Sequence, residues 1–192
     1  MNILLTNDDG IHAPGLKIAR EIASSIAGKG ANVIIVAPAS EQSGVAHSIS
    51  YVRPSLIEQI EKNSYSVEGT PADCILAGID YVMNGKKPDL IISGINRGQN
   101  IAEDVLYSGT IGAAMEGAIH GIKSIALSQS YSKKTLESPH LFDSARKYAV
   151  KVCKKLLLDD PFLEKDFNGF YNINFPASKQ IKYVELRSVR QG

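Results

Sequence analysis

The sequence predicts an α/β protein built on an open, mostly parallel sheet with helices on both faces. Three observations support this prediction. Short apolar runs alternate along the chain with longer amphipathic segments. The apolar runs lack polar alternation, which is typical of parallel strands buried on both faces. No linker or repeat interrupts this order in the first 160 residues, and a repeated strand–helix order indicates a parallel sheet covered by helices.

The elements of the N-terminal part follow from local patterns. Residues 3–6 are a short apolar run and predict the first strand. Residues 14–27 predict a helix, because isoleucines recur at every fourth position and a glycine follows the last turn. The β-branched run at residues 33–36 predicts a second buried strand. Residues 49–68 mix polar and apolar side chains in two stretches, and we predict a small β-hairpin there.

A helix is predicted to begin at residue 70. Thr70 is a favourable N-cap residue, Pro71 suits the first helical position, and Asp73 lies in the first turn, where the helix dipole favours a negative charge.

The remaining part of the chain continues the alternation of strands and helices. The predicted strands are residues 90–92, 124–127 and 171–175, and the predicted helices are residues 110–120 and 141–158.

Composition excludes several classes of protein. The 192 residues contain 21 Lys plus Arg against 20 Asp plus Glu, and they are 44% hydrophobic. This balance is typical of a globular domain and argues against binding to a nucleic-acid duplex. No run approaches the roughly 18 apolar residues that a membrane span needs, and the N-terminus has no signal-peptide pattern. Both cysteines, Cys74 and Cys153, lie in apolar segments, so we expect them to be buried and reduced in a cytoplasmic protein.

The loops after the buried strands are the expected place for a ligand. In an open parallel sheet, ligands bind beyond the carboxyl ends of the strands. Residues 7–10, 38–44 and 93–100 each follow a predicted strand, and each is polar and contains glycine. We therefore expect these three loops to converge at one edge of the sheet.

Two adjacent carboxylates, Asp8 and Asp9, are the most specific feature of these loops. They repel each other unless a positive charge lies beside them, and a divalent cation would remove that repulsion. Ser43 and Asn96 supply further oxygen atoms, and such a set suits Mg²⁺ or Mn²⁺. The alternative is that residues 7–10 form an ordinary turn, since all four residue types favour turns.

Residues 107–112 are a candidate phosphate seat. They lead directly into the predicted helix 110–120, and a helix start offers free N–H groups and a positive dipole end to an anion. The hydroxyls of Ser108 and Thr110 add donors. The alternative is that one of these hydroxyls only caps the helix.

His47 follows the second loop and has two interpretations. It could bind substrate or donate a proton to a leaving group, or it could be a loop histidine bonded to the backbone. No GxGxxG, GxSxG or HExxH pattern is present in the sequence, which argues against a dinucleotide site, an esterase elbow or a zinc protease.

Six motifs are distributed over nearly the whole chain. They are Asn7-Asp8-Asp9-Gly10, Ala37-Pro38 followed by Ser43, Ala46-His47-Ser48, Gly69-Thr70-Pro71-Ala72-Asp73-Cys74, Ser93-Gly94-Ile95-Asn96-Arg97-Gly98 and Tyr107-Ser108-Gly109-Thr110. Taken together, and in this order, they resemble the motifs of the SurE family, the stationary-phase survival proteins that are 5′-nucleotidases.

The resemblance implies a Rossmann-like, doubly wound fold and the metal-dependent hydrolysis of nucleoside 5′-monophosphates to nucleoside and phosphate. It implies one divalent metal ion per subunit, with Asp8 and Asp9 catalytic. The implied metal ligands are Asp8, Asp9, Ser43 and Asn96, and the implied phosphate- and substrate-binding residues are Asn100, Ser108, Gly109, Thr110 and His47. Ala46 departs from the family pattern, which has glycine directly before the histidine, and a methyl group there restricts the loop backbone.

The resemblance also implies a domain division and an assembly. Residues 1–180 correspond to the catalytic domain, and residues 181–192 correspond to the start of a C-terminal extension that family members continue and use to form homodimers or homotetramers. Residues 181–189 alternate like a strand. Two alternatives remain: a nucleotide-binding or scaffold protein with little turnover, and a broader phosphatase that acts on other small phosphoesters or on short polyphosphate.

Overall fold

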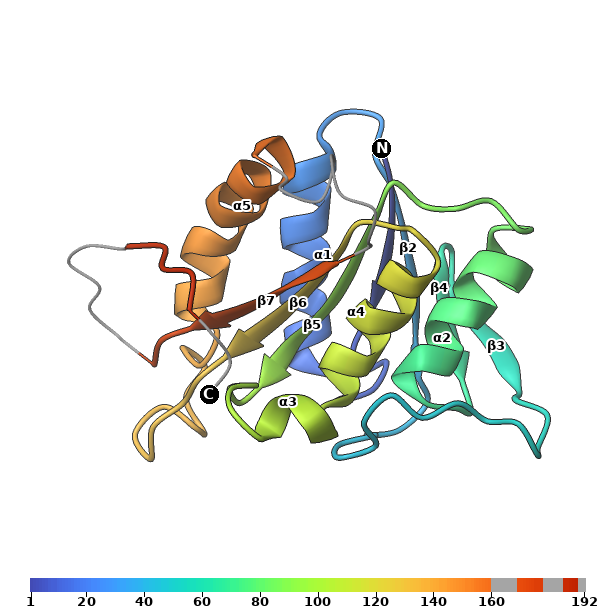
Figure 1. Ribbon diagram of the computed structural model, residues 1–192, viewed down its shortest axis with the longest axis horizontal. Coiled ribbons are helices and arrows are strands. Elements are labelled where there is room, and N and C mark those ends of the chain that lie inside the picture. The colour runs from blue at the N-terminus through green and yellow to red at the C-terminus, as the bar shows by residue number, and fades with distance from the viewer. Residues whose placement is uncertain (160–168, 178–184, 190–192) are drawn as a thin grey trace.

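The fold is a three-layer α/β arrangement around one sheet (Figure 1). The computed structural model describes residues 1–159, 169–177 and 185–189. Within these residues the sheet has seven strands in the order β3-β4-β2-β1-β5-β6-β7. All neighbouring pairs are parallel except β3 and β4. The strands are β1 (Asn2–Thr6), β2 (Asn32–Pro38), β3 (Ile57–Glu61), β4 (Ser64–Val67), β5 (Leu90–Arg97), β6 (Ser124–Gln129) and β7 (Phe170–Phe175).

Helices cover both faces of the sheet, as predicted. The helical segments of the described chain are α1 (Pro14–Ala27), α2 (Pro71–Ala77), the π-helical turn η1 (Gly78–Val82), α3 (Asp104–Tyr107), α4 (Gly109–Ile119) and α5 (Asp143–Leu158). α1 and α5 pack together on one face, and α2 and α4 pack together on the other (Figure 1). The Rossmann-like, doubly wound fold is thereby confirmed.

The core shows why the strands carry continuous apolar runs. Along β1, Ile3 and Leu5 pack against the α1 and α5 side, while Leu4 packs against the side of α2 and η1. All three side chains are fully buried. Each such burial contributes about 1.5–3 kcal/mol, so a polar residue on either face of β1 would be costly.

The strand order places a topological switch point between β1 and β5. From β1 the chain crosses through α1 to β2 on one side, and β5 pairs with the other side of β1. Loops that follow two such strands leave a crevice at their carboxyl ends, where doubly wound proteins bind ligands. The residues that follow β1 and those that end β5 therefore face one another across this crevice.

Two predicted segments differ in extent from the observed ones: the strand that begins at residue 90 and the hairpin at residues 49–68. Residues 93–97, which we expected to be loop, continue β5, and the register against β6 shifts between Ser93 and Asn96. Such a bulge redirects the strand near its end without ending the pairing. The predicted hairpin at residues 49–68 is present as β3 and β4, and because β4 pairs with β2 it is continuous with the main sheet.

The C-terminal predictions fall largely outside the described residues. Residues 181–184 and 190–192 are not described, and residues 185–189 have no regular secondary structure and are exposed. The division of the chain at residue 180 stays a prediction. Cys74 and Cys153 are both free and buried, as expected. None of the helices that can be described is long and apolar enough to cross a bilayer.

The start of α2 contains the predicted N-cap, which is part of a complete capping box. Thr70 Oγ1 accepts the Asp73 N–H at 3.2 Å, and Asp73 Oδ2 accepts the Thr70 N–H at 2.8 Å, which completes a capping box. Asp73 also accepts two hydrogen bonds from Ser50. Burial raises the pKa of Asp73, but the hydrogen bonds from Ser50 and Thr70 outweigh it, so the pKa lies below its ordinary value.

Replacing Asp73 with Asn is expected to destabilise the fold by about 1–3 kcal/mol at pH 7, because an amide cannot accept all of these bonds. The depressed pKa means that the carboxylate stabilises the protein above the unfolded-state pKa. That contribution is lost as the pH falls through the folded-state pKa. Urea unfolding at pH 7 and at pH 3 would therefore show a large difference between wild type and variant at pH 7 and a smaller one at pH 3. An equal difference at both pH values would contradict this account.

Candidate active site

A cavity of about 310 Å³ lies at the carboxyl ends of the central strands. Its lining comes from the loops after β1 and β2, from the end of β5 and the segment beyond it, and from the loop after β6. The lining residues are Asp8, Asp9, Glu41, Ser43, Gly44, Asn96, Arg97, Gly98, Gln99, Asn100, Asp104, Tyr107, Ser108 and Tyr131. The structure thus brings residues of all three predicted loops to one cavity.

Asp8 is the most buried carboxylate of this cavity, with 4% of its surface exposed. It follows β1, and both of its oxygens accept hydrogen bonds from the first turn of α4. Oδ1 accepts from the Thr110 hydroxyl at 2.6 Å, and Oδ2 accepts from the Thr110 N–H at 3.1 Å. Burial, together with the charge of Asp9, raises the pKa of Asp8 to about 6 despite these bonds.

Asp9 lies beside Asp8 and faces the end of β5. Its Oδ2 accepts the backbone N–H of Arg97 at 3.2 Å. Burial raises the pKa of Asp9 above its ordinary value, although the hydrogen bond and the charge of Arg97 act in the opposite direction. Both adjacent carboxyls therefore lie in surroundings that disfavour their charged forms, and a nearby cation would reverse this.

Ser43 and Asn96 complete the predicted ligand set from two other segments. The Ser43 hydroxyl donates to Glu41 Oε1 at 2.8 Å. The Asn96 Nδ2 donates to the Gly98 carbonyl at 3.1 Å, so the amide oxygen is the atom of this side chain that could serve the predicted cation site. The Gln42 N–H donates to the Asp8 carbonyl at 2.7 Å and ties the second loop to the first.

The charge of the cavity supports the prediction of a cation. Its lining contains four carboxylates (Asp8, Asp9, Glu41 and Asp104) and a single guanidinium, that of Arg97. A phosphate dianion would be repelled by such a cavity unless a cation were bound as well. In the described part of the chain, no three His, Cys, Asp or Glu side chains are grouped to hold a metal ion. A site here therefore needs the hydroxyl and amide oxygens with the two carboxylates, and such an oxygen set fits Mg²⁺ or Mn²⁺.

The first turn of α4 packs tightly against this site. The Ser108 Oγ accepts the Ile111 N–H at 3.1 Å, so Ser108 caps the helix and also lines the cavity. A side chain at Gly109 would place its Cβ 3.0 Å from the Cβ of Asp8. Because the Thr110 N–H and hydroxyl both donate to Asp8, in this structure the helix start stabilises that carboxylate.

Asn100 is held by the two strands at the edge of the sheet. Its N–H donates to Asn174 Oδ1 at 2.8 Å, and its Nδ2 donates to Ser128 Oγ at 2.8 Å. Its carbonyl accepts from the side chains of Asn172 and Asn174. β6 and β7 thereby fix the loop that follows β5, and Asn100 lines the cavity while it is 5% exposed.

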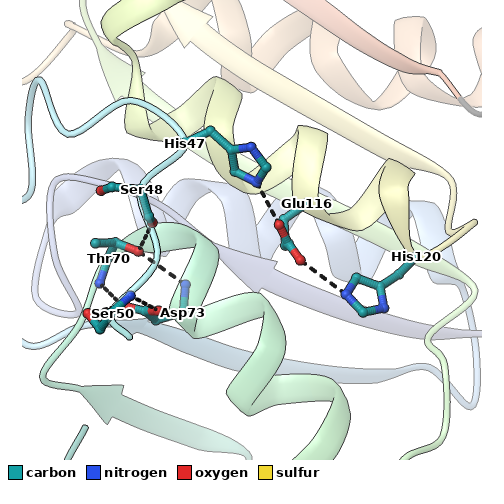
Figure 2. Close-up of polar contacts among 7 residues, drawn as sticks. All are labelled: His47, Ser48, Ser50, Thr70, Asp73, Glu116 and His120. Carbon is teal, nitrogen blue, oxygen red and sulfur yellow. Dashed lines mark hydrogen bonds and ion pairs between the residues drawn. The ribbon is translucent and has the colours of Figure 1, made fainter. Parts of the chain in front are cut away.

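His47 is placed away from the cavity lining. Its Nε2 lies 2.6 Å from Glu116 Oε2 in the middle of α4, a carboxylate partner that neither interpretation of the sequence included. The predicted role of His47 in substrate binding stays a prediction. Figure 2 shows the ring directed at Glu116.

Asp104 and Tyr131 line the cavity and were not singled out from the sequence. Asp104 begins α3, a four-residue helix with no periodicity to reveal it. Tyr131 follows β6, and the rule that ligands bind beyond parallel strand ends could have pointed to the loop that contains it.

Comparisons with known proteins agree with this geometry. The family model "Survival protein SurE" matches residues 3–192. A protein of Ruegeria pomeroyi named "5′-nucleotidase SurE" is 47% identical over 192 residues, which is all of this chain and 74% of that protein. A protein of the same name from Jannaschia is 48% identical over 193 residues, covering 100% of this chain and 73% of its own length.

A solved structure shares the fold. The crystal structure of the SurE protein from Aquifex aeolicus superimposes with a TM-score of 0.78 at 39% identity, over 93% of this chain and 67% of that one. The family match extends over nearly the whole sequence and includes all the residues that line the cavity. The chain belongs to the SurE family.

Proposed function

We propose that this protein is a metal-dependent phosphomonoesterase, a 5′-nucleotidase that hydrolyses nucleoside 5′-monophosphates to nucleoside and phosphate. The relatives that match the whole chain are named 5′-nucleotidases. The structural observation that supports the proposal is the pair of hydrogen bonds between Asp8 and Thr110. They join the predicted cation ligands directly to the helix start that is the predicted phosphate seat.

Asp8, Asp9, Ser43 and Asn96 would hold one divalent cation, Mg²⁺ or Mn²⁺, per subunit. When bound, such an ion lowers the pKa of a water molecule and polarises a phosphoryl oxygen. Burial disfavours the charged forms of both carboxyls. A bound cation would stabilise these charged forms and so relieve the cost of burying them.

The remaining residues position and stabilise the phosphoryl group. Ser108 and the side-chain amide of Asn100 line the cavity beside the carboxylates. They would donate hydrogen bonds to the equatorial oxygens of the phosphoryl group. Gly109 and Thr110 bring the positive end of α4 to the same place. Asp8 or Asp9 would in addition accept a proton from the attacking water. Uncatalysed hydrolysis of a phosphate monoester is so slow that these effects must lower the barrier by on the order of 20 kcal/mol.

The test is phosphate release from a panel of substrates in the presence of Mg²⁺ or Mn²⁺ and after chelation by EDTA. We expect nucleoside 5′-monophosphates to be preferred over 3′-monophosphates, small phosphoesters and short polyphosphate, with activity lost on chelation and restored by one of the two ions. Full activity after chelation would overturn the metal mechanism. Calorimetric binding of a nucleotide without phosphate release would indicate a binding protein, and equal rates on polyphosphate would indicate a broader phosphatase.

We further propose that the protein acts in the cytoplasm and forms a homodimer or homotetramer. The two free, buried cysteines support the location. Large apolar side chains exposed near β3 support assembly, among them Tyr51 at 88% and Val52 at 93% exposure. Light scattering of the purified chain would give the oligomeric state, and a monomer at micromolar concentration would overturn that part of the proposal.

A further inference from the structure

Residues 43–50, here termed the clamped loop, run from the candidate site across the starts of two helices. The loop begins at Ser43 and Gly44, which line the cavity, and it ends where it contacts α2. Figure 2 shows its contacts with α4 on one side and with the start of α2 on the other. Two carboxylates that lie outside the cavity lining make these contacts, Glu116 and Asp73.

Glu116 is 4% exposed in the middle of α4, and a buried carboxylate is costly unless its oxygens find partners. Both of its oxygens are paired with histidines. Oε2 lies 2.6 Å from the Nε2 of His47 on the loop, and Oε1 lies 3.0 Å from the Nε2 of His120 at the end of the same helix. One contact therefore crosses to the loop and the other stays within α4.

Asp73 holds the far end of the loop. Its Oδ1 accepts the Ser50 N–H at 2.9 Å, and its Oδ2 accepts the Ser50 hydroxyl at 2.7 Å. The neighbouring Thr70 hydroxyl donates to the Ser48 carbonyl at 2.6 Å. These bonds attach Ser48 and Ser50 of the loop to the capped start of α2.

The middle of the loop lies directly on α4. The Ala46 N–H donates to the Tyr107 carbonyl at 2.9 Å. A Cβ at Gly112 would lie 2.5 Å from the Ala46 carbonyl oxygen and 2.9 Å from the Cα of His47. This approach is possible only because residue 112 has no side chain, so the loop backbone is fitted to this face of the helix.

We propose that Glu116 and Asp73 are positioning residues, which clamp the loop at His47 and at Ser50 and so fix Ser43 at the candidate cation site. The inference rests on the proposed function for the role of Ser43, but the clamp itself rests on the contacts above. Outer groups that orient a ligand commonly change metal affinity by about 10–100-fold when they are removed. If Glu116 only stabilised the fold, removing His47 and removing His120 would have the same effect on activity.

The experiment compares His47→Ala with His120→Ala. The two variants are matched, because each of them removes one histidine partner of Glu116. The first readout is amide hydrogen exchange of the metal-free protein at Ala46 and Ser50. The second is the Mn²⁺ concentration that gives half-maximal phosphate release, with KM and kcat measured at saturating metal. We also include His47→Gln, whose amide can donate to Glu116 again.

We expect His47→Ala to speed exchange at Ala46 about tenfold, because losing a hydrogen bond to a charged group favours local opening. The half-maximal Mn²⁺ concentration should rise about tenfold, while kcat at saturating metal changes less. His120→Ala should change neither readout, and His47→Gln should restore part of both. Equal effects of the two alanine variants would overturn the proposal, as would faster exchange in His47→Ala without any change in metal activation.

A failure of the proposed function would look different. If the wild type released no phosphate, Mn²⁺ binding by calorimetry would replace activation as the second readout, and exchange in the metal-free protein would still report on the clamp. Unchanged exchange in His47→Ala together with an unchanged Mn²⁺ affinity would then overturn the clamp independently of catalysis.

Discussion

Replacing Asp8 with Asn is expected to lower kcat/KM for phosphate release by a factor of roughly a hundred to a thousand. The substitution keeps the shape of the side chain and an acceptor for Thr110, but it removes a charged oxygen from the proposed cation site. Loss of a preorganised electrostatic group of this kind costs about 3–4 kcal/mol of barrier lowering, and each 1.4 kcal/mol is roughly a factor of ten in rate.

The same variant should gain stability relative to wild type as the pH rises, when metal is removed. Burial raises the pKa of Asp8 from its ordinary 3.8 to about 6 in the folded protein. The folded state therefore binds the proton more tightly than the unfolded chain does, and the free energy of unfolding of the wild type falls as the pH rises from about 4 through about 6. By this shift Asn at position 8 would be about 3 kcal/mol more favourable relative to Asp above pH 6 than below pH 4. A loss that does not depend on pH acts against this at both pH values, because the amide NH2 cannot accept the second hydrogen bond from Thr110.

Activity assays with Mg²⁺ or Mn²⁺ and urea unfolding in EDTA at pH 5 and pH 8 would check both effects. Asp104→Asn is the matched control, because Asp104 lines the same cavity but is exposed. We expect it to lower kcat/KM less than about tenfold and to leave stability nearly unchanged. Retained activity in Asp8→Asn would contradict the proposed role of this carboxylate. The same difference in stability between variant and wild type at pH 5 and pH 8 in EDTA would contradict its unfavourable burial.

The strands of the fold could be predicted because burial on both faces leaves a continuous apolar run. Leu90, Ile91 and Ile92 are fully buried on alternating sides of β5, and such a run in a short segment is typical of a central parallel strand. The end of β5 could not be predicted, because residues 93–97 are mostly polar and contain glycine, with Ile95 as the single apolar side chain. Pairing with β6 after a register shift keeps them in the sheet.

The candidate site could be predicted only as far as topology determines it. The carboxyl ends of parallel strands meet, so Asp8, Asp9 and Asn96 were expected to lie together. The bonds between Asp8 and Thr110 join residues 102 positions apart, and the pair of His47 with Glu116 joins residues 69 positions apart. No local pattern carries such information, because Glu116 in the sequence is an ordinary polar residue of a helix.

Replacing Gly112 with Ala is expected to lower phosphate release about a hundredfold at limiting metal. The new Cβ would lie 2.5 Å from the Ala46 carbonyl oxygen, a contact with backbone that no side-chain rotation can relieve. The loop of residues 43–50 would have to move away from α4, and a displacement of about 1 Å at a site can cost about a hundredfold in rate.

Gly117→Ala is the matched control on the same helix. Its Cβ would lie 2.3 Å from the Ser124 Oγ and 2.5 Å from the Ile91 Cδ1, so it also overpacks, but against side chains of the sheet and away from the loop. Overpacking of this kind destabilises by about 1–3 kcal/mol, partly offset by the better helix propensity of alanine, which is worth about 1 kcal/mol. Thermal unfolding should therefore give a smaller loss of stability for Gly117→Ala, whose contacts are with side-chain ends that can rotate, than for Gly112→Ala.

Activity then separates the position of the loop from the stability of the fold. Below the unfolding transition, we expect Gly117→Ala to keep at least about half of the wild-type activity and Gly112→Ala to lose nearly all of it at limiting Mn²⁺. If moving the loop acts through Ser43, raising the Mn²⁺ concentration should restore part of the activity of Gly112→Ala, since weakened binding is overcome by mass action. Parallel losses in both variants would mean that α4 affects catalysis only through stability, and an unaffected Gly112→Ala would mean that the loop does not position the site.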